Sequence, residues 1–213
     1  GSGGGSMCSA LVMRSVGKSV VILEKTDLIG GTTARSGGVM WIPNNPLMKR
    51  EGVEDSLEKA TTYMDSLIGD HNDTPGTSRE RRHIYLTEAP QMVEFLLSHG
   101  LKFDRVPDWA DYYDDLPGGS AESRSICPDL FDATELGEWN RKLRRGRFAK
   151  YPARHSELFK MMHIKQSLEA KFLAMKMVVR GAFAKPTGGE IVGAGTALQG
   201  RMLKACLKHD VGL

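Results

Sequence analysis

Length, composition and charge set the first limits on what this chain does. The 213 residues are 40% hydrophobic and 26% charged, as is usual for a globular protein. The net charge of +3 lacks the basic excess of a dedicated nucleic-acid binder, so no nucleic-acid partner is expected. No apolar run reaches the roughly 18 residues of a transmembrane segment, and no signal peptide is recognised. Three cysteines without a CxxC pair are typical of reduced thiols, so a cytoplasmic location is expected.

The first segment is predicted to form a glycine turn, a helix and a strand, in that order. Residues 7–16 are small and apolar enough for a buried helix, which Gly17 ends. Residues 19–24 form a short β-branched apolar run, which is typical of a strand buried on both faces. This order of elements is the beginning of a dinucleotide-binding unit.

The glycine turn itself fits the dinucleotide fingerprint GxGxxG. Gly1 and Gly3 match its first two glycines, and Ser6 supplies a small residue at the third position. The helix that follows presents free N–H groups and a partial positive charge to phosphate groups. Glu24 ends the next strand, near the ~20-residue offset at which an acidic residue binds the ribose hydroxyls.

A second interpretation of the same residues stays open. The run GSGGGS also matches a flexible engineered linker, with Met7 as a native start. The helix, Gly17 and Glu24 favour the fingerprint, because a linker does not predict them. Since the fingerprint normally follows a central strand, we expect that this strand is missing and that the sequence is an internal fragment of a larger protein.

Further along the chain, apolar spacing and turn residues outline the remaining elements. Residues 26–45 are predicted to be a loop, residues 101–103 a short strand, and residues 106–130 a long ordered loop. Apolar residues at helical spacing predict helices in ranges 55–68, 78–99, 155–180 and 196–209. Asp55 and Glu58 form a capping-box pattern at the start of the first of these helices. Residues 211–213 resemble the start of another strand.

Several segments together resemble the FAD-dependent oxidoreductases of the fumarate reductase and 3-ketosteroid dehydrogenase group. The most specific is LEKTDLIGGTTARSGG at residues 23–38, and the likeness continues in residues 39–45, 107–113, 118–119, 123–126 and 195–203. The resemblance implies an α/β fold: a Rossmann-like FAD-binding domain, incomplete because its first strand is missing, with part of a helix-rich cap or substrate domain. The implied domains are residues 1–105 for FAD binding, 106–190 for the cap, and 191–213 for the return to the FAD-binding domain.

The resemblance also implies a cofactor and the residues that hold it. The cofactor is FAD, and no metal is expected. Its pyrophosphate would be lined by Gly1, Gly3, Gly5 and Ser6, and its ribose would be bound by Glu24 with Lys25 beside it. Phosphate or ribitol would contact Gly30, Gly31, Thr32 and Thr33, and the flavin would lie close to Ser36, Gly37 and Gly38. Taken alone, the two glycine pairs are more typical of plain turns, and the GxGxxS and Glu24 match favours the cofactor role.

One catalytic residue is implied, on the steroid-dehydrogenase branch of the group. Tyr112 would lie in the substrate pocket and assist another tyrosine, beyond Leu213, that removes a proton next to the ketone while the flavin takes a hydride. A phenol needs such help, because its ordinary pKa is ~10. The alternative is that Tyr112 and Tyr113 form an aromatic pair that packs a loop.

The resulting hypothesis is an FAD-dependent dehydrogenase that acts next to the ketone of a hydrophobic small molecule such as a 3-ketosteroid. The fragment alone is expected to be inactive, and the electron acceptor stays open. Two alternatives remain: a fumarate-reductase-like flavoprotein that runs in the opposite direction, and an inactive nucleotide-binding fragment. Tyr112 and Tyr113 match the steroid-dehydrogenase branch more than the fumarate-reductase branch, so the dehydrogenase is the first hypothesis.

Overall fold

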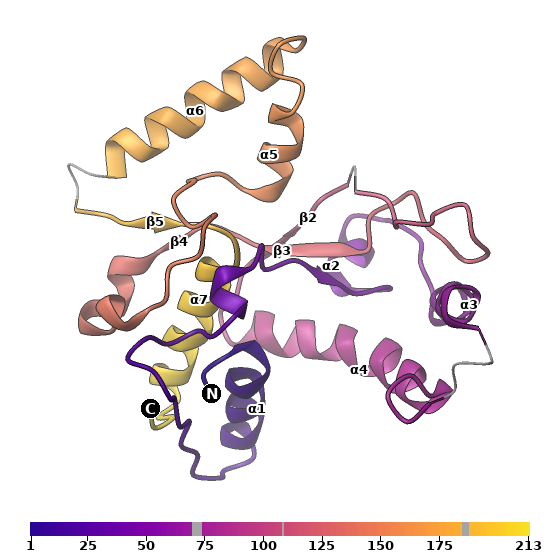
Figure 1. The fold of residues 1–213 in the computed structure, drawn as a ribbon, viewed down its shortest axis with the longest axis horizontal. Helices are drawn as coiled ribbons and strands as arrows, with labels where there is room; N and C mark the ends of the chain where they lie inside the picture. Colours follow the sequence, from indigo (N-terminus) through magenta and orange to yellow (C-terminus); the bar gives the residue numbers. More distant parts are fainter. Residues whose placement is uncertain (70–73, 108, 185–187) are drawn as a thin grey trace. The chain divides into compact units, whose positions relative to one another are not determined.

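The computed structural model describes residues 1–69, 74–107, 109–184 and 188–213, and Asp108 of the resembling segments lies outside them. The chain forms two compact units, drawn in Figure 1. Unit 1 comprises Gly1–Val39, His99–Phe103 and Cys127–Leu213, and unit 2 comprises Met40–Ser98 and Asp104–Ile126. The functional domain boundaries expected after residues 105 and 190 stay a prediction.

Unit 1 contains helices together with one small sheet. Its helices are α1 (Gly4–Ser15), η1 (Thr33–Arg35), η2 (Ala133–Lys142), α5 (His155–Met161), α6 (Leu168–Ala184) and α7 (Ala194–Lys208). Its strands β4 (Phe131–Asp132) and β5 (Ile191–Val192) pair antiparallel, with Phe131 opposite Val192. The helices expected at residues 7–16 and 196–209 are therefore confirmed as α1 and α7.

Helix α7 is the centre of unit 1. It packs against α1 and η1, and Leu198 and Leu203 are among its many buried residues. Gly200 allows close packing, because a Cβ there would lie 2.6 Å from the ring of Phe131. Helix α1 contributes Met7 and Leu11 to the same core. The start of α1 is thus held against a well-packed helix.

Residues 19–24 are extended, but they are not buried on both faces as expected. The Ile22 N–H donates to the Gly212 carbonyl at 2.8 Å, and the Gly212 N–H donates to the Val20 carbonyl at 3.0 Å, which confirms the strand start near residue 211. Ile22 is buried, whereas Val21 is 64% exposed and Leu23 is 77% exposed. The expectation of two buried faces is therefore wrong. Successive side chains of an extended segment point to opposite faces, and unit 1 covers one of them.

The prediction of a single helix over residues 155–180 is also wrong, since the chain forms α5 and α6 with turns between them. Ser167 supplies the physical reason: its hydroxyl accepts a hydrogen bond from the Ala170 N–H at 3.3 Å, as a capping serine does at a new helix start. The second helix exposes large apolar side chains, among them Leu168 and Phe172.

Unit 2 packs three helices with short strands. The helices are α2 (Pro46–Arg50), α3 (Leu57–Ile68) and α4 (Arg79–Ser98). The strands are β1 (Met40–Trp41), β2 (Phe103–Arg105) and β3 (Ser125–Pro128), of which Phe103, Cys127 and Pro128 are counted with unit 1. The strand order is β1-β3-β2, and Met40 lies opposite Ile126. The cap of α3 is Ser56, whose hydroxyl accepts from the Lys59 N–H, rather than the expected Asp55. Asp55 pairs instead with an arginine described below.

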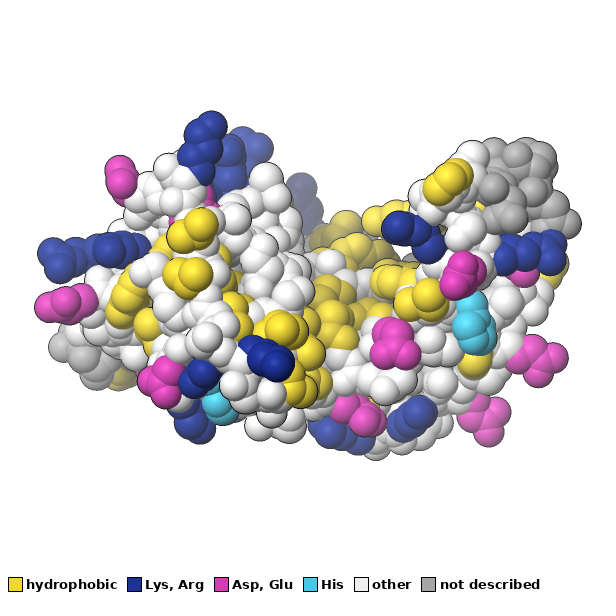
Figure 2. Space-filling model, turned by 90° about the horizontal axis from the view of Figure 1, so that it is seen from below, with side chains coloured by type: hydrophobic (Ala, Val, Ile, Leu, Met, Phe, Trp, Pro, Cys, Tyr) yellow, Lys and Arg dark blue, Asp and Glu magenta, His cyan; other side chains and the backbone are white. Residues whose placement is uncertain are grey.

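The surface carries mixed charge. On the face shown in Figure 2, Lys and Arg side chains are interspersed with Asp and Glu side chains. Among the helices of the described ranges, none is both long and apolar enough to span a bilayer.

Candidate cofactor site

The first turn of α1 is open to an anionic ligand. Gly3 is the N-cap and supplies no side-chain hydrogen bond, and the Gly4 N–H donates to Thr33 Oγ1 at 3.1 Å. The first N–H groups of any helix lack intrahelical partners and carry a partial positive charge, which suits phosphate oxygens. Gly5 and Ser6 are exposed in this turn, and a Cβ on Gly5 would meet no atom within 4 Å in the part of the chain that the structure describes. This turn therefore fits the pyrophosphate of a dinucleotide.

Glu24 lies beside the glycine turn, as the fingerprint predicts. Its Oε2 accepts from the N–H of Ser2 at 2.8 Å and from the Ser2 hydroxyl at 2.6 Å. Its Oε1 accepts from the Thr26 N–H at 3.0 Å. The Ser2 hydroxyl, followed by the Thr26 N–H, lowers the pKa of Glu24 to about 2, so the carboxylate is ionised near neutral pH.

One acceptor position of Glu24 stays available for a ribose hydroxyl. Thr26 Oγ1 lies 3.2 Å from Glu24 Oε1 and 2.9 Å from the Leu28 carbonyl. A hydroxyl has one proton to donate, and the shorter contact goes to Leu28. Since a carboxylate offers about four lone-pair positions, Oε1 retains one that a ligand hydroxyl could use.

Ser2 connects three segments of the site, and sequence reasoning missed it. Besides its two bonds to Glu24, its hydroxyl accepts from the Gly30 N–H at 2.9 Å, and its side chain is fully buried. The position falls between the first two fingerprint glycines, where the motif specifies no residue type. The only indication of this role in the sequence was that serine is small and polar.

Gly30 and Gly31 bring the second predicted segment to the same turn. Both have left-handed φ values, +119° and +53°. A Cβ on Gly31 would lie 3.5 Å from the Gly3 Cα, so the two backbones approach closely. Thr33 follows and bonds to the Gly4 N–H, while Thr32 precedes η1 without a side-chain cap bond. The residues of this predicted segment therefore lie around the start of α1.

Ser36, Gly37 and Gly38 lie instead beside the start of α7. The Gly195 N–H donates to the Ser36 carbonyl at 3.0 Å, and the Ser36 hydroxyl accepts from the Gly38 N–H at 3.0 Å. A Cβ on Gly38, whose φ is +75°, would lie 2.9 Å from the Gly195 nitrogen. Close backbone packing accounts for Gly38, so its predicted place near the flavin rests on the resemblance. Lys25 is exposed.

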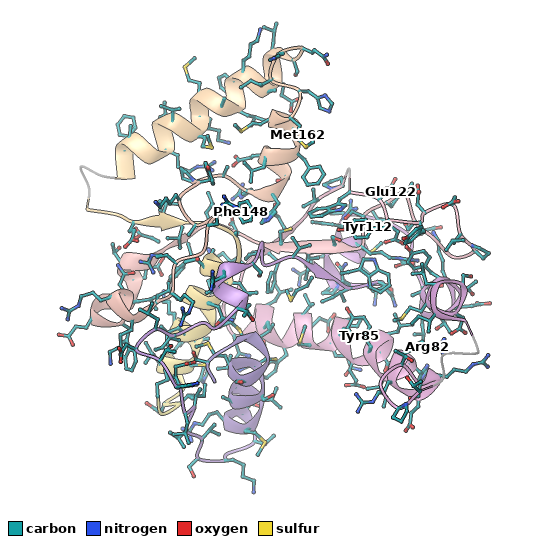
Figure 3. All side chains as sticks on the ribbon, viewed as in Figure 1. Arg82, Tyr85, Tyr112, Glu122, Phe148 and Met162 are labelled. Atoms are coloured by element: carbon teal, nitrogen blue, oxygen red, sulfur yellow. The ribbon has the colours of Figure 1, made fainter. Side chains whose placement is uncertain are left out.

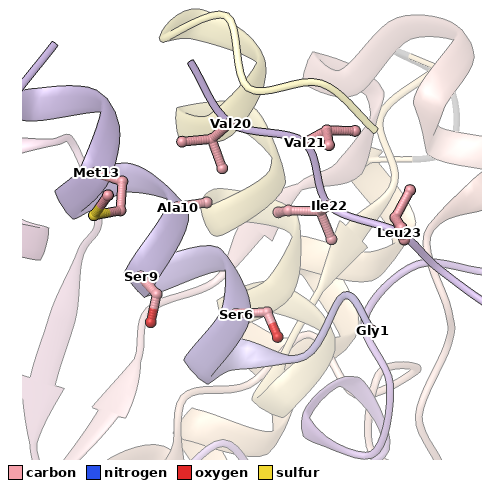
Figure 4. A pocket seen from close by; sticks show the side chains of 9 residues that line it. All are labelled: Gly1, Ser6, Ser9, Ala10, Met13, Val20, Val21, Ile22 and Leu23. Atoms are coloured by element: carbon pink, nitrogen blue, oxygen red, sulfur yellow. The ribbon is translucent and has the colours of Figure 1, made fainter. Parts of the chain in front are cut away.

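A pocket of about 460 Å³ extends from the glycine turn along the extended segment. Figure 4 shows it between α1, with Ser6 and Ser9, and the segment from Val20 to Leu23. Its walls are therefore partly polar at the helix and apolar along the segment.

Tyr112 belongs to unit 2, in the loop between β2 and β3 (Figure 3). It is 83% exposed and Tyr113 is also exposed, so the two rings do not pack the loop as the alternative expected. The preceding residue anchors this loop: Asp111 is buried and accepts from the Ser120 N–H at 3.1 Å and from Arg124 at 2.8 Å. The phenol of Tyr112 is thus presented on a fixed loop.

Arg124 is the centre of a buried ionic cluster in unit 2. It is fully buried and binds Asp55 through two nitrogens, at 2.9 and 2.8 Å, and Asp111 through the third. Its guanidinium also lies 5.5 Å from the ring centre of Tyr63 and 5.9 Å from that of Trp41. Every charge of this cluster is hydrogen-bonded, which is the condition for burying it.

The fold and the open helix at the glycine turn define a dinucleotide-binding protein of the flavoprotein type. Residues 1–211 match the FAD binding domain family, and the chain belongs to that family. This finding confirms the expected resemblance, the α/β flavoprotein fold and FAD as the cofactor. The roles of individual residues stay predictions.

Proteins similar to this chain include ketosteroid dehydrogenases. It is 38% identical over 205 residues to 3-oxosteroid 1-dehydrogenase of Mycobacterium tuberculosis, which covers 94% of the chain and 35% of that protein. It is 36% identical over 203 residues to the enzyme of the same name from Mycolicibacterium smegmatis, with 93% and 35% covered. The crystal structure of 3-ketosteroid delta1-dehydrogenase from Sterolibacterium denitrificans, in complex with 1,4-androstadiene-3,17-dione, matches with a TM-score of 0.89 at 31% identity, covering 100% of the chain and 38% of that structure. The chain thus spans 35% of the length of these two curated relatives.

Proposed function

We propose that this chain is the cofactor-holding part of a flavin-dependent dehydrogenase that introduces a C=C bond next to the ketone of a 3-ketosteroid. The start of α1 is the observation that carries the proposal, because an N-cap without a side-chain bond lies beside an ionised carboxylate. FAD, when bound, supplies a hydride acceptor. The similarity to ketosteroid dehydrogenases supports the substrate class.

The proposed roles of the chain's residues follow from their chemistry. The N–H groups of the first turn of α1 would bind the pyrophosphate, and Glu24 would accept a hydrogen bond from the ribose. An ionised Glu24 also disfavours a 2′-phosphate by charge repulsion, so it fits the unphosphorylated ribose of FAD. Thr33 holds the turn through the Gly4 N–H.

Tyr112 is the proposed substrate-side residue of this chain. Its phenol is exposed on a loop that the buried Asp111 anchors, so most of its surface is accessible to a ligand. A neutral phenol can donate a hydrogen bond to a substrate oxygen or to a second phenol.

Retention of FAD by the purified chain tests the cofactor part. The chain is mixed with FAD, freed of excess by gel filtration, and its visible absorbance is measured. We expect retention by the native chain and loss in Gly3→Val, which places a branched side chain over the helix start. Gly76→Val is the control, because a Cβ at Gly76 meets no atom of the described residues within 4 Å. A folded chain that retains no flavin contradicts the proposal.

The substrate part is tested on the FAD-loaded chain by titrating 1,4-androstadiene-3,17-dione and following the flavin spectrum. Tyr112→Phe should weaken the spectral change, whereas Tyr113→Phe, in the same loop, should leave it intact. Equal responses of the two variants count against a role for Tyr112. A flavin spectrum that no steroid alters counts against the substrate class.

A further inference from the structure

Gln199 of α7 has a fully buried side chain whose carboxamide lacks a hydrogen-bond partner in the described part of the chain. Within the described ranges, neither Oε1 nor Nε2 has a partner. Arg144 and Arg201 also have an unpaired buried nitrogen, but another nitrogen of each is hydrogen-bonded. Because buried amides are almost always hydrogen-bonded, an amide with neither atom paired calls for an explanation.

The side chain of Gln199 runs to the glycine turn. A Cβ on Gly30 would lie 3.4 Å from Gln199 Cγ, and a Cβ on Gly4 would lie 3.3 Å from Gln199 Nε2. The carboxamide therefore ends at the first residue of α1, on the side where Thr33 Oγ1 also meets Gly4. Glycines at both positions leave the space that the side chain occupies.

The charge distribution of the amide fits this place. The NH₂ group is the positive end of the carboxamide dipole, and its Nε2 lies 3.3 Å from the Cβ position of Gly4, at the positive end of the α1 helix. The positive end of the amide dipole and the positive end of the helix dipole repel each other weakly. Both of them attract an anion that is bound at the same turn. An apolar side chain of equal length would pack in the same space without either effect.

We propose that Gln199 is a cofactor-positioning residue that holds the first turn of α1 and adds the dipole of its carboxamide to the electrostatic attraction for the pyrophosphate of FAD. It acts through the Gly4 turn, since its side chain is buried beneath that turn. This inference rests on the proposed cofactor site, and it concerns the pyrophosphate in particular rather than the ribose or the flavin.

The test compares two probes of the site, ADP and adenosine, which differ by the pyrophosphate. Binding is measured by isothermal titration calorimetry for the native chain and for Gln199→Met, which keeps the length of the side chain and removes the dipole. We expect Gln199→Met to reduce the preference for ADP over adenosine about fivefold, because interactions with a charged group are stronger than those between neutral groups. Its melting temperature without ligand should be equal to or above that of the native chain, since an unpaired buried amide has been removed.

Thr196→Val is the matched control on the same helix. Thr196 is buried, and its hydroxyl accepts from the Gly146 N–H at 2.9 Å and donates to the Ala34 carbonyl at 3.0 Å. The control should lower the melting temperature and leave the ADP preference unchanged. If Gln199→Met does not fold by circular dichroism, Gln199→Leu is measured in the same way.

An unchanged ADP preference in the folded Gln199 variant overturns the inference and leaves the cofactor site intact. An equal loss of ADP and adenosine binding also overturns it, because the effect would then not involve the pyrophosphate. A native chain that retains neither FAD nor ADP overturns the proposed function together with this inference. The two failures are therefore distinguishable.

Discussion

Ser2 hydrogen-bonds to Glu24 twice, through its N–H at 2.8 Å and its hydroxyl at 2.6 Å, and these bonds join residues 22 positions apart. The same hydroxyl accepts from the Gly30 N–H. A single buried serine thus holds the glycine turn, the acidic residue and the second glycine pair in one arrangement, so the geometry of the site depends on it.

Ser2→Ala is expected to destabilise unit 1 and to weaken FAD binding. The variant leaves the buried Gly30 N–H without its acceptor, which costs about 1–3 kcal/mol. Urea unfolding followed by circular dichroism measures this loss. Ser15→Ala, at the exposed end of α1, should change stability by less than about 0.5 kcal/mol. Equal effects of the two variants would show that the Ser2 network does not hold the turn.

The stability of the chain should depend on pH through the ionisation of Glu24. Its pKa is lowered to about 2 from an ordinary value of 4.5, so its contribution is fully present above pH 4.5 and is lost as the pH falls toward 2. Melting temperatures of the native chain and Glu24→Gln are compared from pH 2 to pH 7. Because Glu157 also has a pKa lowered to about 2, the difference between the two proteins is the informative quantity. A difference that does not shrink below pH 4.5 contradicts the prediction.

Arg124→Met is expected to destabilise unit 2 strongly. The variant leaves Asp55 and Asp111 buried without their partner, and breaking a buried ion pair in this way costs about 3–5 kcal/mol. Arg145→Met is the matched control: Arg145 pairs with Glu190 at 2.7 Å where both side chains are partly exposed, so its loss should cost at most about 1 kcal/mol. Urea unfolding provides the comparison, and similar midpoints for both variants would argue against the cluster.

Gly195→Ala tests the packing of the predicted flavin-side segment against α7. A Cβ at Gly195 would lie 1.9 Å from the Thr33 carbonyl oxygen, so the backbone must shift. Overpacking of this kind costs about 1–3 kcal/mol, and a lower melting temperature is expected. Gly76→Ala should have little effect, because a Cβ there meets nothing within 4 Å among the described ranges. A stable Gly195→Ala variant would mean that η1 and α7 are separated more widely than the structure indicates.

Much of the fold could be predicted from the sequence where local rules apply. The helix at α1 and its end near Gly17 followed from apolar residues and one glycine, and α4 with its end near Gly100 followed in the same way. The position of Glu24 beside the glycine turn followed from the spacing of the fingerprint. The break between α5 and α6 was not predicted. A serine inside an apolar helical pattern occurs both within helices and at their N-caps, so the pattern alone did not indicate that Ser167 begins a second helix.

Local periodicity determined α1, α3, α4 and α7 because the hydrogen bonds of an α-helix join residues four positions apart, so the pattern and the structure cover the same short range. Only tertiary packing decided the rest. It placed Arg124 against Asp55, 69 positions away, set Ser36–Gly38 beside the start of α7, and turned Gln199 toward Gly4. Such contacts depend on which buried surfaces pack together, and the spacing of residues along the chain does not indicate which surfaces these are.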